Sequence, residues 1–159
     1  KIIRGNVDTR IKKLKDGDYD AIILSNAGIK FLNFDNEISE IFSLEQVIPS
    51  AGQGIIALQC REGDEEIISV LKKINHKETF IRAHVERNIL KVLEGDCETA
   101  VGAHSKIEGD KITVEAELFS LDGSKRFHEK KTGKLEKFSQ IGRELGQILK
   151  TKSNNSYKR

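Results

Sequence analysis

The stretch KETFIRAHVERNILKVL, residues 77–93, decides the fold of the second half of the chain. Its apolar side chains recur at helical spacing, at Ile81, Val85, Ile89, Leu90 and Leu93. Such spacing places them along one face, so the pattern predicts a long amphipathic helix over these residues. Asn75 and His76 come immediately before it, and we take this pair as a domain boundary.

Downstream of this helix the sequence predicts three strands and a last helix. We expect them near Ala100–Ile107, Lys111–Phe119, Lys125–Lys131 and Leu135–Leu149. Gly109 and Gly123, each beside an aspartate, supply the hairpin turns between the strands. Residues 76–152 are therefore expected to form a small α-β-β-β-α domain. Residues 153–159 form a polar tail that we expect to be frayed and flexible.

Residues 1–74 predict an alternation of strands and helices. The apolar run Ala21–Leu24 is continuous, which is typical of a strand buried on both faces of a parallel sheet. Together with Lys1–Ile3 and the helical stretch Val7–Lys15, it predicts a β-α-β unit. The next expected elements are a short helix, a strand and a longer helix, at Asn36–Ser43, Ile55–Cys60 and Asp64–Ile74.

Two arginines bracket the segment RGNVDTR, residues 4–10. Asn6 is expected to cap the helix that follows, because its side-chain oxygen can accept an unpaired amide hydrogen of the first turn. Arg4 then lies just ahead of this helix and Arg10 one turn inside it. Since the helix macrodipole is positive at this end, the segment suits carboxylates or phosphates.

Two further segments predict ligand-facing loops. Ser25 begins a small-residue turn at the carboxyl end of a predicted strand, which is where open α/β sheets bind ligands. Pro49–Gly54 is a glycine-containing crossing, and its glycines permit backbone angles that other residues resist. This crossing is either a hinge or a ligand-facing loop.

Composition narrows the function classes. Charged residues make up 33% of the 159 residues and the formal net charge is +2, too near balance to indicate nucleic-acid binding by itself. No apolar run approaches the roughly 18 residues of a membrane span. The four histidines show no metal-ligand spacing, and no carboxylate pair stands out as a catalytic couple.

Cys60 and Cys97 do not form a disulfide framework, which favours a reducing cytosol. Cys60, inside a predicted apolar strand, is expected to be core. Cys97 is either a small buried hydrophobe or a reachable thiol in a glycine-containing loop. Its neighbours Asp96 and Glu98 disfavour the thiolate, so a slow, once-only attachment suits this sulfur better than repeated turnover.

Several segments, in this order, resemble the porphobilinogen deaminase (hydroxymethylbilane synthase) family. They are Arg-Gly-Asn-x-x-Thr-Arg at 4–10, Tyr-Asp-Ala-Ile-Ile-Leu at 19–24, Ala-Gly-Ile-Lys at 27–30, Ile-Pro-x-x-Gly-Gln-Gly at 48–54, Cys-Arg at 60–61, Asn-His-x-Glu-Thr at 75–79 and Leu-Glu-Gly-x-Cys at 93–97. The resemblance covers essentially the whole chain, and it is to the carboxyl-terminal half of a three-domain protein.

The resemblance implies a fold that is α/β and α+β. Residues 1–49 would be the carboxyl-terminal part of a periplasmic-binding-protein-like βα domain, domain two. Residues 50–75 would be a crossover strand and helix of domain one or its hinge, and residues 76–152 would be domain three with the anchoring cysteine. Most of domain one and the first part of domain two are expected to lie outside these residues.

It also implies a cytoplasmic transferase of tetrapyrrole, and hence porphyrin and heme, biosynthesis. Family members polymerise four porphobilinogen units, with loss of ammonia, into hydroxymethylbilane on a dipyrromethane primer. That cofactor is held by a thioether to the loop cysteine, here Cys97. The partners implied are porphobilinogen, the growing polypyrrole and the amino-terminal half of the same protein, which is expected to be monomeric at full length, with no membrane, nucleic acid or metal.

Carried over by position, five residues join Cys97 in the cofactor site. Arg4 and Arg10 would bind the pyrrole carboxylates, and the Ser25 backbone, Gln53 and Gly54 would line the same cleft. The family usually has arginine where this chain has Phe31, which removes one expected carboxylate contact. The catalytic aspartate of the family belongs to the other half, so we expect no catalytic residue here and no turnover by these residues alone.

A second interpretation comes from a different function class. The order α-β-β-β-α is shared with double-stranded-RNA-binding domains, so residues 77–149 are alternatively a non-catalytic anion- or RNA-binding module. Such domains need clustered lysines at the start of their last helix. Four lysines loosely qualify, at Lys130, Lys131, Lys134 and Lys137, although a solvated face explains them as well.

Overall fold

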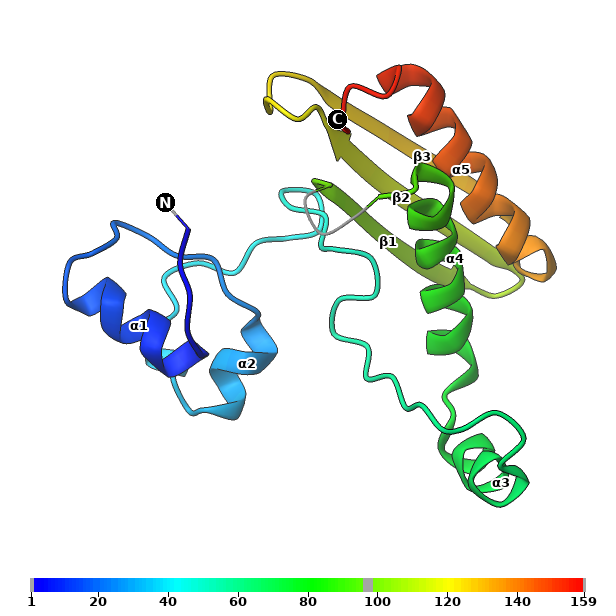
Figure 1. Cartoon of the computed structure of the whole chain (residues 1–159), viewed down its shortest axis with the longest axis horizontal. Coiled ribbons are helices and arrows are strands. Elements are labelled where there is room, and N and C mark those ends of the chain that lie inside the picture. Colours follow the sequence, from blue (N-terminus) through cyan, green and yellow to red (C-terminus); the bar gives the residue numbers. More distant parts are fainter. Residues whose placement is uncertain (1, 96–98, 159) are drawn as a thin grey trace. The chain divides into compact units, whose positions relative to one another are not determined.

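The chain was analysed as a computed structural model that describes residues 2–95 and 99–158. It divides into two compact units, Lys1–Ser43 and Leu44–Arg159 (Figure 1). Each unit is built around its own internal contacts.

The second unit contains the predicted α-β-β-β-α arrangement. Its three-stranded antiparallel sheet has the order β1-β2-β3 and consists of β1 (Val101–Glu108), β2 (Lys111–Phe119) and β3 (Arg126–Lys134). Helices α4 (Lys77–Leu93) and α5 (Phe138–Ser153) pack on each other and on this sheet (Figure 1). A 3-10 turn, η2 (Leu135–Lys137), leads into α5. The fold class predicted for this region is confirmed.

The core of the second unit lies between the two helices and the sheet. Alternate residues of β2 face it, because side chains of a strand alternate between the two faces. These side chains and those of the helix stripes are buried together: Ile112, Val114, Ala116 and Leu118 from β2, Val85, Ile89 and Leu93 from α4, and Ile141, Leu145 and Leu149 from α5. Burial of this apolar area is the main favourable term in the stability of the unit.

Two glycines let α4 and α5 approach closely. A Cβ atom on Gly142 would lie 2.3 Å from the carbonyl oxygen of Val85, and one on Gly146 would lie 2.9 Å from Cβ of Val92. Since a real Cβ cannot occupy either position, only glycine permits this spacing of the helices.

The first unit holds α1 (Val7–Lys15), α2 (Asn26–Phe31) and a 3-10 turn, η1 (Asp35–Glu37). Gly28 of α2 comes close to Val7 of α1, since a Cβ on that glycine would lie 3.5 Å from the valine Cγ2. An ion pair joins Lys15 to Glu37, and the Tyr19 hydroxyl donates to the carbonyl oxygen of Ile2 over 2.9 Å.

Three predicted strands are not strands in the structure. Residues 2–3, 21–24 and 55–60 have no ladder partner among the described residues. An extended segment becomes a strand only when a neighbour supplies the alternating hydrogen bonds, so an apolar sequence alone does not suffice. The helix predicted over Asn36–Ser43 is also wrong, because only the 3-10 turn η1 forms there. So short a segment is marginal as a helix unless packing supports it.

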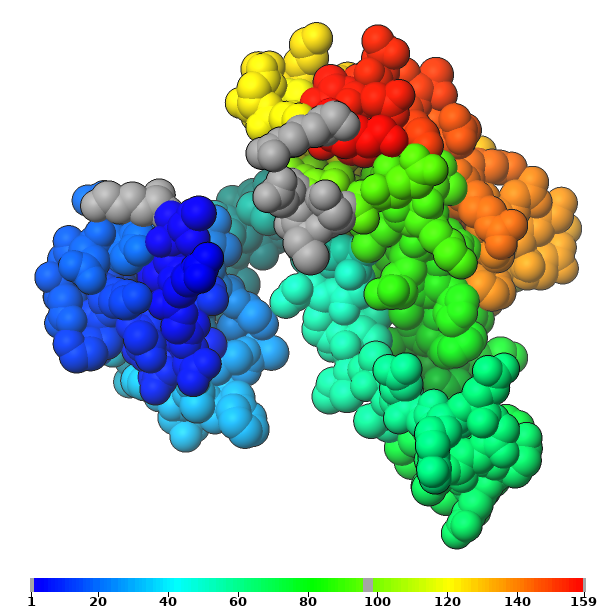
Figure 2. All heavy atoms as spheres, viewed as in Figure 1, coloured from blue at the N-terminus to red at the C-terminus, as the bar shows by residue number. Residues whose placement is uncertain are grey.

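Helix α3 (Glu65–Ile74) is confirmed where it was predicted. Asp64 caps it, because its carboxylate accepts a hydrogen bond from the Ile67 amide at 3.3 Å. The apolar stripe of α3 is exposed, as the residues Ile67, Val70 and Ile74 are 44%, 49% and 64% accessible. Figure 2 shows α3, in blue-green, at the opposite end of α4 from the red carboxyl-terminal residues.

The expectation of a frayed tail is wrong for the part of the tail that the structure describes. Helix α5 continues to Ser153, and Tyr157 is only 1% exposed within the core cluster. The sequence shows a run of polar residues, but the aromatic ring of Tyr157 among them packs into the core.

Candidate functional site

The segment with the two arginines forms the amino-terminal end of α1. Gly5 has a φ of 123°, and a Cβ there would lie 2.8 Å from Cγ2 of Thr9, so both backbone and space require glycine. The side chain of Arg10 folds back and its Nε donates to the Gly5 carbonyl oxygen over 2.7 Å. Gly5, Thr9 and Arg10 are therefore in close contact with one another at the start of the helix.

Asn6 is the N-cap residue by position, but its side chain makes no capping hydrogen bond. The prediction of a side-chain cap is wrong. Instead the carboxylate of Asp8 accepts from the Thr9 amide at 2.7 Å. An acidic side chain in the first turn also interacts favourably with the positive end of the helix.

The arginines leave substantial capacity for an anion. A guanidinium carries five N–H donors, and the bond to Gly5 uses one of those of Arg10. This bond fixes the guanidinium at the positive end of α1, while Arg4 is exposed immediately before Gly5. Planar guanidinium groups held in this way are suited to paired contacts with carboxylates.

Ser25 lies in the same unit, as the N-cap residue of α2, and is exposed without a side-chain capping bond. The next residue, Asn26, has a buried side-chain oxygen with no hydrogen-bond partner among the described residues. Phe31, where the family usually has arginine, is 85% exposed.

Gln53 and Gly54 lie in the second unit, on two consecutive tight turns. The Gln53 amide donates to the Ser50 carbonyl oxygen over 2.9 Å, and the Ile55 amide to that of Gly52 over 3.1 Å. Gly52 and Gly54 have φ values of 76° and 77°, a region that favours glycine. The glycine crossing is thus an ordered pair of turns with the Gln53 side chain exposed.

Glu86 of α4 fixes these turns and was missed by the sequence analysis. It is 3% exposed, and its Oε2 accepts from the Gly52 amide at 2.8 Å. Its Oε1 accepts from both the amide and the hydroxyl of Ser105, at 2.9 and 2.7 Å. The signal in the sequence was an acidic residue directly beside the buried stripe of α4, one position after Val85.

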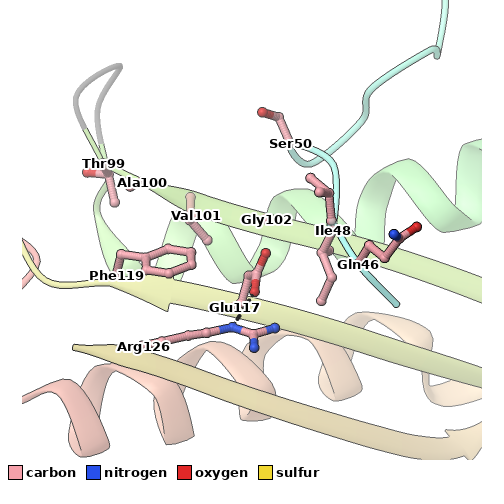
Figure 3. A pocket seen from close by; sticks show the side chains of 11 residues that line it. Gln46, Ile48, Ser50, Thr99, Ala100, Val101, Gly102, Glu117, Phe119 and Arg126 are labelled. Atoms are coloured by element: carbon pink, nitrogen blue, oxygen red, sulfur yellow. Dashed lines mark hydrogen bonds and ion pairs between the residues drawn. The ribbon is translucent and has the colours of Figure 1, made fainter. Parts of the chain in front are cut away.

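The segment before these turns runs along the edge of β1. The Ala103 amide donates to the Pro49 carbonyl oxygen over 2.9 Å. A Cβ on Gly102 would lie 2.6 Å from the carbonyl oxygen of Ile48. A surface hollow lies between this segment and the sheet (Figure 3). In it Arg126 Nε contacts a carboxylate oxygen of Glu117 at 2.7 Å.

Cys97, Asp96 and Glu98 lie outside the described residues, so the predicted attachment site and the influence of its acidic neighbours stay predictions. The residues before it are described. Glu94 ends α4 in the left-handed conformation with a φ of 53°, and the amides of Glu94 and Gly95 both donate to the Leu90 carbonyl oxygen.

Cys60 does not lie where the sequence predicted it. Cys60 is half-buried and lies in no strand, so the expectation of a core residue in a strand is wrong. It lines an open surface hollow together with Arg61 and Asp64, whose side chains form an ion pair at 2.9 Å.

The histidines lie on the predicted kinds of element. His84 is on α4, His104 on β1 and His128 on β3. Burial, with the nearby charge of Arg82, lowers the pKa of His104 below its ordinary value. His128 Nε2 contacts a carboxylate oxygen of Glu115 at 2.8 Å. Within residues 2–95 and 99–158, no cluster of three metal-ligating side chains occurs.

Two of the lysines considered for RNA binding are engaged in ion pairs. Lys130 contacts Glu115 at 3.3 Å, and Lys131 contacts Glu144 at 3.0 Å. Carboxylates thus offset part of the positive charge that a nucleic-acid surface would need. None of the helices in the described part of the chain is both long and apolar enough to cross a bilayer.

Two family models match the chain. Residues 1–69 match "Porphobilinogen deaminase, dipyromethane cofactor binding domain", and residues 80–151 match "Porphobilinogen deaminase, C-terminal domain". The first contains Arg4, Arg10, Ser25, Gln53 and Gly54, and the second contains Glu86 and Cys97.

Curated relatives agree with both matches. The chain is 36% identical over 151 residues to the porphobilinogen deaminase of Prochlorococcus marinus, covering 95% of this chain and 48% of the relative. That of Desulforamulus reducens is 37% identical over 147 residues, with 92% and 48% covered. That of Brevibacillus brevis is 39% identical over 132 residues, with 82% and 43% covered. The chain therefore spans about half the length of these relatives and belongs to the porphobilinogen deaminase family.

Proposed function

We propose that this chain forms part of a transferase that joins four porphobilinogen units into hydroxymethylbilane, on a dipyrromethane primer attached to Cys97. The observation that carries the proposal is the guanidinium of Arg10, which is held at the positive end of α1, with exposed Arg4 immediately before Gly5 in the sequence. It lies in the region that matches the cofactor-binding domain of the family.

The donor set fits such a cofactor, because each pyrrole ring carries acetate and propionate groups. Arg4 and Arg10 supply planar cationic donors for these carboxylates. The backbone at Ser25 and the turn at Gln53 and Gly54 supply neutral polar groups. When bound, the primer supplies the pyrrole carbon to which each new unit is joined, with loss of ammonia from that unit.

The roles of these residues are to bind and orient. Bonding to Gly5 holds one edge of the Arg10 side chain, so little conformational entropy remains to be lost when a carboxylate binds. Glu86 orders the turn that carries Gln53 and Gly54, because its carboxylate accepts a hydrogen bond from the Gly52 amide. Acid–base chemistry at the pyrrole ring is assigned to the remainder of the protein.

The proposal includes a cytoplasmic location and a monomeric whole protein in which the other half of the relatives' length supplies the catalytic aspartate. We expect these 159 residues alone to show no turnover of porphobilinogen. The side chains of Ile23 and Ile56 are exposed although they lie in segments with a strand-like sequence. This exposure supports packing of these segments against the other half of the protein.

Intact mass of the whole protein tests the attachment. We expect the mass of a dipyrromethane adduct in the wild type and in the control Cys60→Ser, and its absence in Cys97→Ser. An unmodified Cys97 in active protein, or an adduct that survives Cys97→Ser, would contradict the proposal.

The role of Arg10 is tested by steady-state kinetics of the whole protein. Arg10→Lys keeps the charge but loses the planar fork, so we expect the KM for porphobilinogen to rise about tenfold. Arg143→Lys, at an exposed position of α5, is the matched control and should leave KM unchanged. Equal kinetics for the two variants would remove Arg10 from the site. Salt-sensitive retention of the chain on duplex RNA would instead favour the RNA-binding alternative.

A further inference from the structure

The carboxyl-terminal residues turn back onto the end of α4. Asn154 and Asn155 have φ values of 47° and 57°, so two successive left-handed residues reverse the chain after α5. Asparagine adopts this conformation more readily than most residues. The Leu121 amide donates to the Ser156 carbonyl oxygen over 2.9 Å, which fixes the reversed segment beside the hairpin between β2 and β3.

Tyr157 then reaches the last residue of α4. Its ring is buried in the core, and its hydroxyl donates to the Leu93 carbonyl oxygen over 2.8 Å. The last carbonyls of a helix have no partner within the helix, so this hydroxyl satisfies a buried acceptor that would otherwise be unpaired. Figure 2 shows the red carboxyl-terminal residues directly against the green end of α4.

Two lysines hold the same turn. Lys150 Nζ donates to the Val92 carbonyl oxygen at 3.2 Å and to the Glu94 carboxylate at 3.0 Å. Lys158 Nζ donates to the same carboxylate oxygen at 3.1 Å. Both positive charges stand at the negative end of the helix, which favours them. They also hold Glu94 in a left-handed conformation that is unfavourable for a residue with a side chain.

We propose that Lys150, Tyr157 and Lys158 form a carboxyl-terminal clasp that sets the direction in which the chain leaves α4 toward Cys97. They are positioning residues, and none is expected to touch substrate. The inference rests on the proposed function only in taking Cys97 as the attachment point. Contacts of the clasp with Val92, Leu93 and Glu94 stand independently of it.

Amide hydrogen exchange of the 159-residue chain tests the contacts. Tyr157→Phe keeps the ring but leaves the Leu93 carbonyl without its donor, so exchange at the Glu94 and Gly95 amides is expected to accelerate about tenfold. Tyr19→Phe is the matched control, because it removes a tyrosine hydroxyl that also donates to a carbonyl, in the first unit. Unchanged exchange at Glu94 and Gly95 in Tyr157→Phe would overturn the clasp.

Cofactor loading of the whole protein tests the positioning role. The double variant Lys150→Met and Lys158→Met should form the Cys97 adduct about tenfold more slowly, because a displaced sulfur reacts less readily, whereas arginine at both positions should retain most of the wild-type rate. Accelerated exchange combined with wild-type loading would overturn the positioning role. Absence of any adduct in the wild type would overturn the proposed function and this role together, while the exchange result would still report on the contacts.

Discussion

Most apolar side chains from Lys77 onward are buried, whereas many of those before it are exposed to solvent. Beyond Lys77, the buried faces of two helices and a sheet close on one another, and Leu118 and Leu145 are fully inaccessible. Before it, Ile23 and Ile56 are 75% and 89% exposed, although both lie in apolar runs. Apolar patterning thus specifies where a strand or helix stripe can form, whereas a partner decides whether it is buried.

The sharpest test of this contrast replaces the same residue type in both regions. Leu145→Ala removes a fully buried side chain and should lower the free energy of unfolding by about 2–5 kcal/mol. Leu58→Ala, at a position that is 60% exposed, should change it by less than about 0.5 kcal/mol. Urea unfolding of the chain measures both. Similar losses would mean that the exposed segment is packed in solution.

A second pair of substitutions replaces a helical glycine by alanine in each of the two units. Gly142→Ala places a Cβ 2.3 Å from a backbone oxygen of α4, so the helices must separate and the unfolding free energy should fall by about 1–3 kcal/mol. Gly28→Ala meets only Val7 at 3.5 Å and gains helix propensity, so it should be neutral or stabilise by up to about 1 kcal/mol. A tolerated Gly142→Ala would contradict the close helix packing.

Glu86 links the closed region to the turns before it. Glu86→Gln keeps one acceptor oxygen and loses the other, so either Gly52 or Ser105 loses its partner at a cost of about 1–3 kcal/mol. Glu78→Gln, exposed on the same helix, should cost only a few tenths. Urea unfolding gives the energies, and faster exchange of the Gly52 amide would locate the loss.

The smallest expected effect concerns pH. Because burial and Arg82 lower the pKa of His104, the unfolded chain binds this proton more readily than the folded chain. Stability should therefore fall as pH drops through about 6.5, the ordinary histidine value. His104→Gln should make the dependence between pH 7 and 5 shallower, whereas Thr132→Ala on the same sheet should not. An unchanged slope in His104→Gln would exclude the effect.

The fold from His76 onward could be predicted because its patterns are local. Each helix stripe and each hairpin turn is read from neighbouring residues, and the elements then cover one another. Only the ends differ: the third strand runs Arg126–Lys134 and the last helix continues to Ser153. Before His76, the strands predicted at 21–24 and 55–60 needed partners that local sequence does not reveal, and they did not form.

The candidate site also has features that local sequence predicts and features that it does not. The place of Arg4 and Arg10 at a helix start follows from the glycine and the apolar spacing after it, and the structure has that helix. Glu86 and Tyr157 were missed because their partners lie far along the chain, 34 residues away for Gly52 and 64 for Leu93. Which buried acceptor meets which donor is decided by packing.

The segment along β1 has a consequence for association between molecules. An exposed sheet edge offers free amides to any other extended chain, and so promotes aggregation. Here Pro49 and Glu86 already occupy the outward amides of Ala103 and Ser105, and the outer strand β3 carries a row of cationic side chains, including Lys130 and Lys134. Both edges of this small sheet therefore carry features that oppose pairing with another extended chain.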